Sequence, residues 1–132
     1  MIPVDQEFSH DENNGVWGDC MRAVIASLLD LPRNEVPHFL HEAKGDRYQF
    51  DLLVAKFCQS KGLVYMQCLM EAWSLPADAV VYHEIMGPSP RDPTLFHAVV
   101  GRNGEIVHDP HPDKIGLAGD PTDWWYGFLV KA

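Results

Sequence analysis

Cysteine is scarce in this chain, and basic residues are few beside the acidic ones. Three cysteines, Cys20, Cys58 and Cys68, occur among 132 residues, and none belongs to a CxxC pair. A disulfide framework is therefore not expected, and a reducing compartment fits this composition. Ten basic residues against 19 acidic ones give a formal net charge of −9. Because a protein with this charge repels phosphate backbones, we expect no nucleic acid partner.

Long apolar runs are also missing. No run approaches the roughly 20 residues that a membrane-spanning helix requires, so we expect no membrane association. The segment from Met1 to Glu7 has neither the basic region nor the apolar core of a signal peptide, and a cytoplasmic location is expected. Without repeats or linkers, and with 46% hydrophobic residues, the sequence predicts one globular domain over residues 1–132.

Two segments in the first half carry the apolar spacing of amphipathic helices. From Cys20 to Leu31 apolar residues recur at helical intervals, and Pro32 ends the pattern. A second helix is expected from about Arg47 to Lys61. The glycine that follows it favours the left-handed conformation found at helix ends.

The second half contains short segments rich in β-branched and aromatic residues, which are typical of strands. An Asn-Gly dipeptide at Asn103-Gly104 favours a tight hairpin turn between two of them. Since helices precede an antiparallel sheet, the predicted class is α+β, with N-terminal helices packed on the sheet. The five predicted strands are Leu63–Leu69, Ala79–Ile85, Leu95–Gly101, Glu105–His108 and Trp124–Val130.

Cys20, His97 and Asp109 occur in an order that suits a cysteine hydrolase. Cys20 opens the first helix, where free N–H groups and the helix dipole favour a thiolate. Hairpin pairing around Arg102-Asn103 would place His97 opposite His108 and Asp109. We therefore predict Cys20 as nucleophile, His97 as general base and acid, and Asp109 as the residue that orients His97. This chemistry requires no cofactor.

Each of these residues also has a simpler interpretation. Cys20 can be a small buried residue of an amphipathic helix, and Asp109 can be a turn-forming residue before a proline. His108 and His111, together with Cys20 and His97, supply donor atoms for zinc, but no pair has a recognised zinc-ligand spacing, so we expect no metal. Either of the two downstream histidines can also replace Asp109 in the orienting role.

Three segments resemble the papain-like cysteine peptidase superfamily, above all its bacteriocin-processing peptidases. They are Trp17-Gly18-Asp19-Cys20-Met21-Arg22-Ala23, His97-Ala98-Val99-Val100 and Val107-His108-Asp109-Pro110. The chain is also similar to small phage and prophage proteins of about this size. The resemblance implies a papain-like fold with the site between helices and sheet. It also implies a peptidase or isopeptidase that acts on a peptide or protein substrate through an acyl-enzyme.

Papain-like enzymes place a glutamine several residues before the cysteine, where its amide helps to bind the oxyanion. The corresponding stretch here contains Asn14, six residues before Cys20, together with Asn13, and no glutamine. We expect the Asn14 amide to take this role together with the Cys20 backbone N–H. Trp17, Asp19 and Arg91 are the residues that we expect to contact the substrate, Arg91 from a proline-rich loop.

Two other functions are compatible with the same fold. A papain-like binding module without turnover, which acts on a host protein by occupying it, fits the short chain and the missing glutamine. A cysteine-dependent acyltransferase or deamidase keeps the triad and changes the acceptor. An activated Cys20 thiolate distinguishes an enzyme from a binding module.

Overall fold

The computed structural model describes residues 1–69 and 74–132 of the chain, and its helices precede its strands. The helices are α1 (Cys20–Leu28), α2 (Phe39–Glu42) and α3 (Arg47–Ser60), with 3₁₀ turns at Glu12–Asn14, Arg33–Glu35 and Pro121–Asp123. The strands are β1 (Leu63–Leu69), β2 (Tyr82–Pro88), β3 (Phe96–Arg102), β4 (Glu105–His108) and β5 (Trp125–Lys131). The described chain is therefore α+β, as predicted.

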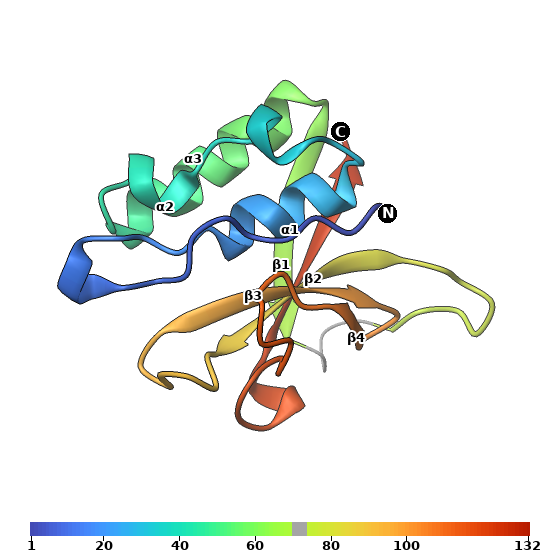
Figure 1. Cartoon of the computed structure of the whole chain (residues 1–132). Coiled ribbons are helices and arrows are strands. Elements are labelled where there is room, and N and C mark those ends of the chain that lie inside the picture. The colour runs from blue at the N-terminus through green and yellow to red at the C-terminus, as the bar shows by residue number, and fades with distance from the viewer. Residues whose placement is uncertain (70–73) are drawn as a thin grey trace.

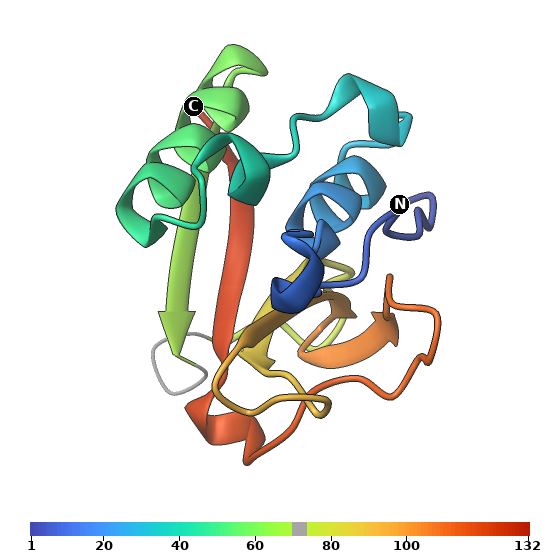
Figure 2. The ribbon, with the colours of Figure 1, turned by 60° about the vertical axis from the view of Figure 1, so that its left-hand side comes forward.

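These strands form one antiparallel sheet in the order β1-β5-β2-β3-β4. The helices of the described residues lie together on one side of the sheet (Figure 1). In the turned view α3 lies beside β1, whereas α1 lies over the half of the sheet that contains β2 and β3 (Figure 2). This arrangement brings the start of α1 close to the strands that carry His97 and Asp109.

Two apolar clusters stabilise the sheet, one on each face. Alternate residues of β3 enter different clusters, because successive side chains of a strand point to opposite faces. The cluster on the helix side includes Val24, Ile25, Phe39, Val54, Ala98 and Val100. The cluster on the other face consists of Ile85, Val99, Trp124 and Tyr126 with partly buried neighbours.

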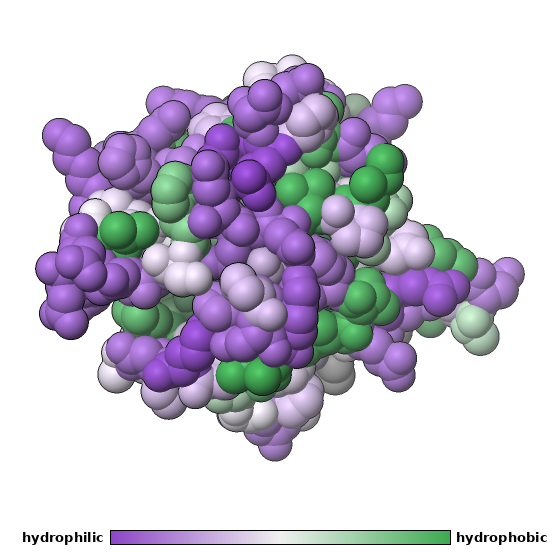
Figure 3. All heavy atoms as spheres, viewed as in Figure 1, coloured by the Kyte–Doolittle hydropathy of each residue, from purple (hydrophilic) through white to green (hydrophobic). Residues whose placement is uncertain are grey.

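No helix among residues 1–69 and 74–132 has the length and apolar character needed to cross a membrane. The face of the molecule seen in Figure 3 is mainly hydrophilic. Apolar side chains occur on that face in small separate groups.

Helix α1 begins at Cys20 as predicted, but it ends at Leu28 and not at Leu31. Asp30 adopts a left-handed conformation with a φ of 54°. The Leu31 N–H then donates a hydrogen bond of 2.9 Å to the Ala26 carbonyl. This pattern is a Schellman motif, which closes the helix early and satisfies one of its last carbonyls.

The strand predictions agree best where turns are explicit in the sequence. β1 and β4 have the predicted bounds, β3 and β5 each lie one residue further along, and β2 lies three residues further along. The hairpin turn ends β3 at Arg102, which pairs with Tyr82, so the residues before Tyr82 have no partner there. Val81 instead exchanges hydrogen bonds with Asn103. Helix α2 was not predicted.

Candidate active site

Cys20 is the first residue of α1, and the chain before it is held in a close turn. Gly18 lies against the segment that precedes it: a Cβ added there would be 3.1 Å from the His10 Cβ. The N–H of Cys20 is in the first helical turn, where backbone donors have no partner within the helix. The sulfur is therefore presented at the end of α1 that carries free N–H groups and a partial positive charge.

Asp19 fixes the N-terminal segment beside this helix start. Its Oδ1 accepts hydrogen bonds from the backbone N–H groups of Glu7, at 2.9 Å, and Phe8, at 2.8 Å. Its other oxygen lies 3.6 Å from the Arg22 guanidinium, and the side chain is inaccessible to solvent. We expected Asp19 to contact the substrate. Its carboxylate instead accepts hydrogen bonds from backbone N–H groups of the protein, so the geometry favours a structural role.

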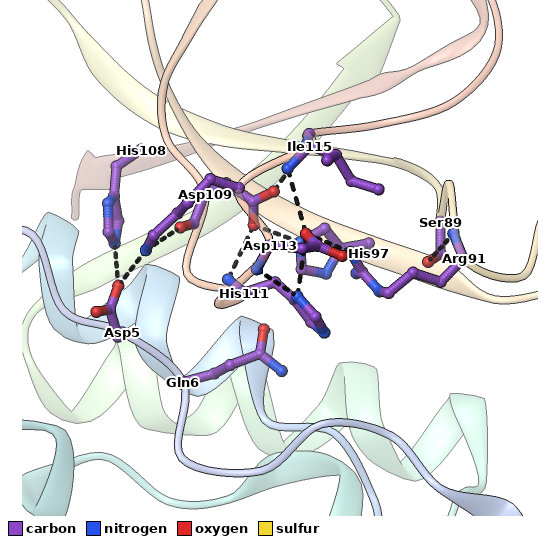
Figure 4. A network of polar contacts seen from close by, with 12 residues as sticks. Asp5, Gln6, Ser89, Arg91, His97, His108, Asp109, His111, Asp113 and Ile115 are labelled. Atoms are coloured by element: carbon purple, nitrogen blue, oxygen red, sulfur yellow. Dashed lines mark hydrogen bonds and ion pairs between the residues drawn. The ribbon is translucent and has the colours of Figure 1, made fainter.

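His97 and Asp109 lie in direct contact. The Nε2 of His97 is 2.7 Å from Oδ1 of Asp109, and both side chains are buried (Figure 4). Asp109 also accepts hydrogen bonds from the backbone N–H groups of His111, at 2.9 Å, and Gly116, at 2.7 Å. The carboxylate is therefore rigidly held and fully hydrogen-bonded, and it fixes the ring of His97.

The hairpin brings these two residues together, though in a slightly different register from the predicted one. Asn103 and Gly104 both have positive φ, 50° and 87°, as a two-residue type I′ turn requires. Arg102 consequently pairs with Glu105, and an irregularity after Val100 shifts the register once more. Asp109 therefore lies just beyond β4, in the loop that returns toward the start of β3.

The electrostatic environment favours a charged pair. Burial lowers the pKa of His97, but hydrogen bonds with Asp109 and with Cys20 outweigh it and raise that pKa to about 9. Burial raises the pKa of Asp109, yet the bonds from His97, His111 and Gly116 bring it down to about 2. Because Nε2 of His97 is paired with Asp109, Nδ1 is the ring nitrogen left for Cys20.

A cavity of about 790 Å³ is lined by Cys20 and His97, and also by Trp17 and Arg91, whereas Asp109 does not line it. Trp17 is held in place because its ring packs on Gly45, where an added Cβ would lie 2.3 Å from Cη2. Arg91 is already paired within the protein, since its Nη1 donates to both carboxylate oxygens of Asp113 at 2.8 and 3.0 Å.

The structure does not bring Asn14 to the site. Its Nδ2 donates a hydrogen bond of 2.6 Å to Asp11 Oδ2 within an exposed turn, and it does not line the cavity. The turn is closed by a bridge between Asp11 and Val16. The neighbouring Asn13 lines the cavity, but the expected oxyanion role of Asn14 has no geometric support.

Gln6 is one of the cavity residues that the sequence analysis missed. Its Nε2 donates a hydrogen bond of 2.7 Å to the Phe8 carbonyl, while Oε1 is buried with no hydrogen-bond partner among the described residues. Its backbone N–H donates a bond of 3.0 Å to the Pro110 carbonyl, beside Asp109. Figure 4 shows Gln6 next to the polar network around Asp109 and His111. A glutamine upstream of Cys20 was the available signal, but it lies 14 residues away instead of six.

The two downstream histidines do not orient His97. His108 bonds through Nε2 to the Val4 carbonyl at 2.9 Å, and His111 faces His97 edge-on with ring centroids 6.1 Å apart. Across the described ranges, no three His, Cys, Asp or Glu side chains are grouped in a way that could hold a metal ion. The contact between His97 and Asp109 thus distinguishes Asp109 from the alternatives.

Cys58 is fully buried, and burial raises the pKa of its thiol to about 11.

Comparison of the chain with protein-family models, with curated proteins and with solved structures found no match.

Proposed function

We propose that this protein is a papain-like cysteine hydrolase that cleaves peptide or isopeptide bonds through Cys20, His97 and Asp109. The observation that supports it most directly is the hydrogen bond of His97 with a buried carboxylate beside the cavity that Cys20 and His97 both line, where the interaction with Cys20 also raises the pKa of His97. Three groups in this order have the roles of nucleophile, proton carrier and orienting residue. The position of Cys20 in this cavity, at the start of α1, adds the electrostatic setting that a thiolate needs.

The reaction begins with proton transfer from the Cys20 sulfur to Nδ1 of His97. The thiolate attacks the substrate carbonyl carbon, and a tetrahedral intermediate with a negatively charged oxygen forms. As that intermediate collapses, the C–N bond breaks and His97 donates its proton to the leaving nitrogen. A thioester to Cys20 remains. His97 then takes a proton from water, whose oxygen attacks the thioester, and the acid product leaves as the thiol is restored.

We assign to Gln6 the oxyanion-binding role that the sequence predicted for Asn14. A tetrahedral intermediate requires donors aimed at its oxygen, and the Cys20 N–H supplies one. Gln6 lines the same cavity, and its Nε2 has a second N–H beyond the one that bonds to Phe8. Hydrogen bonds hold the segment that carries Gln6. The Pro110 carbonyl accepts the Gln6 N–H, and the Asp19 carboxylate accepts the N–H groups of the two residues that follow Gln6.

The test is the pH dependence of Cys20 alkylation by iodoacetamide, followed by mass spectrometry of the Cys20 peptide. An ordinary thiol is less than about 1% ionised at pH 6, so a His-paired thiolate should react on the order of a hundredfold faster there. His97→Ala should remove this excess. Cys58 and Cys68 in the same sample are internal controls. A rate that rises only near pH 8.5 and ignores His97→Ala would overturn the hydrolase and leave the binding module.

A further inference from the structure

One end of the cavity is apolar and contains a single arginine. Arg47, the first residue of α3, lines this end together with Phe50, Met86 and Phe96. Phe96 is the first residue of β3, directly before His97, and it is 58% exposed. The arginine is therefore next to the strand that positions the general base.

The guanidinium of Arg47 is held between two aromatic rings. Its central carbon lies 5.5 Å from the ring centroid of Phe50 and 5.5 Å from that of Phe96. Its Nη2 donates a hydrogen bond of 3.5 Å to the thioether sulfur of Met86, which is a weak acceptor. Contacts of this kind fix the orientation of the planar group and leave its strong hydrogen-bonding capacity unused.

Two carboxylates interact with Arg47, Glu84 and Asp51. Glu84 acts on it electrostatically without a recorded hydrogen bond, and burial raises the pKa of Glu84 to about 7. Asp51, one helical turn along α3, approaches Nε at 3.3 Å, and both side chains are more than half exposed. An exposed pair at this spacing contributes only about 0.3–0.5 kcal/mol. No acceptor among the described residues faces Nη1. The outer edge of the guanidinium, Nη1 with Nη2, is thus available to a ligand in the cavity.

Acidic side chains also line the cavity, namely Asp11, Glu12 and Asp92, and so do two further arginines, Arg22 and Arg91. Those two arginines are already paired with carboxylates of the protein, Arg22 with Glu7 and Asp19 and Arg91 with Asp113. A negatively charged group of a substrate is therefore attracted most strongly toward Arg47. A carboxylate matches the planar fork of arginine with two parallel hydrogen bonds. The methylene groups that carry a side-chain carboxylate would pack on the exposed ring of Phe96.

On the basis of the proposed hydrolase function, we infer that Arg47 and Phe96 form a specificity subsite for an acidic side chain, glutamate or aspartate, of the peptide substrate. The acidic residue lies on one side of the scissile bond, because Arg47 adjoins Phe96, directly before His97, whereas Arg22 and Arg91 are paired with carboxylates of the protein. Arg47 binds its carboxylate, and Phe96 contacts its aliphatic part.

The test uses two panels of irreversible probes for Cys20. In peptidyl fluoromethyl ketones the peptide extends toward the acyl side, and in chloroacetyl peptide amides it extends toward the leaving-group side. Each panel compares a glutamate probe with its glutamine counterpart, and the readout is the ratio of the two inactivation rates. A ratio cancels any general change in Cys20 reactivity.

We expect one panel to show a glutamate preference of about tenfold, consistent with a charge-assisted hydrogen bond. Arg47→Gln should bring the ratio to about one, whereas Arg102→Gln, the same charge change outside the cavity, should keep it. Ratios near one in both panels, or a preference that survives Arg47→Gln, overturn the subsite. If iodoacetamide still labels Cys20 rapidly at pH 6 in that case, the hydrolase proposal stands without it. A Cys20 that is inert to iodoacetamide overturns both.

Discussion

The Nε2 of His97 lies 2.7 Å from Oδ1 of Asp109, and a second oxygen of the same carboxylate accepts the Gly116 N–H. This contact determines which ring nitrogen of His97 remains for Cys20. It also joins two chain segments, the start of β3 and the loop after β4, whose relation depends on one hairpin. The first prediction concerns the charge of this carboxylate.

Asp109→Asn should lower the pKa of His97 from about 9, because the substitution removes the negative charge that stabilises the imidazolium. We expect Cys20 alkylation at pH 6 to slow by about tenfold or more, since less thiolate is then present. The measurement is the pH profile of alkylation together with an NMR titration of His97. An unchanged His97 midpoint in the variant would show that Asp109 does not interact with the ring in solution.

The second prediction separates Gln6 from Asn14. If the Gln6 amide binds the oxyanion, Gln6→Ala should slow hydrolysis of p-nitrophenyl acetate by on the order of a hundredfold to a thousandfold. Alkylation by iodoacetamide forms no oxyanion, so the same variant should keep its alkylation rate within about threefold. Asn14→Ala is the matched control, and we expect neither rate to change. Equal effects of the two substitutions on hydrolysis would contradict the assignment of Gln6.

The positions of Cys20, His97 and Asp109 could be predicted from the sequence, whereas the position of Gln6 could not. Cys20 at a helix start, and the hairpin that joins His97 to Asp109, follow from local patterns: apolar spacing, a glycine turn and an Asn-Gly dipeptide. Their positions were therefore predicted to within a residue or two. The catalytic roles remain predictions.

The position of Gln6 depends on contacts between distant parts of the chain. The bridge of Asp11 with Val16 folds the intervening loop back on itself, and the buried carboxylate of Asp19 draws the segment before it against α1. Neither contact has a local signature. A count of residues before Cys20 therefore selected Asn14, which lies on the outside of that loop.

The third prediction tests the role of Asp19 as an internal anchor. Asp19→Ala leaves the N–H groups of Glu7 and Phe8 without their acceptor, and we expect the free energy of unfolding to fall by about 2–4 kcal/mol. Urea denaturation measures this loss. Asp30→Asn, at an exposed carboxylate that pairs with the N-terminus, is the comparison; asparagine tolerates the left-handed backbone of this position, so the change should cost less than about 1 kcal/mol. If the two variants are equally stable, Asp19 does not anchor the segment.

The last prediction concerns Glu84, a fully buried glutamate in β2. The Tyr65 hydroxyl and the Gln67 amide donate hydrogen bonds to Oε2, while Oε1 has no hydrogen-bond partner among the described residues. Burial raises the pKa of Glu84 to about 7, although the bonds from Tyr65 and Gln67 lower it in part. The folded protein therefore favours the uncharged carboxyl group.

A raised pKa makes stability fall as the pH increases. The contribution of neutral Glu84 is fully present below the unfolded value of 4.5 and is lost as the pH rises through about 7. We expect the wild type to lose on the order of 3 kcal/mol of unfolding free energy from this group between pH 4.5 and 8. Glu84→Gln, which cannot ionise, should show a flatter profile, measured by urea denaturation across this range. Parallel profiles for the two proteins would mean that Glu84 does not take up a proton on folding.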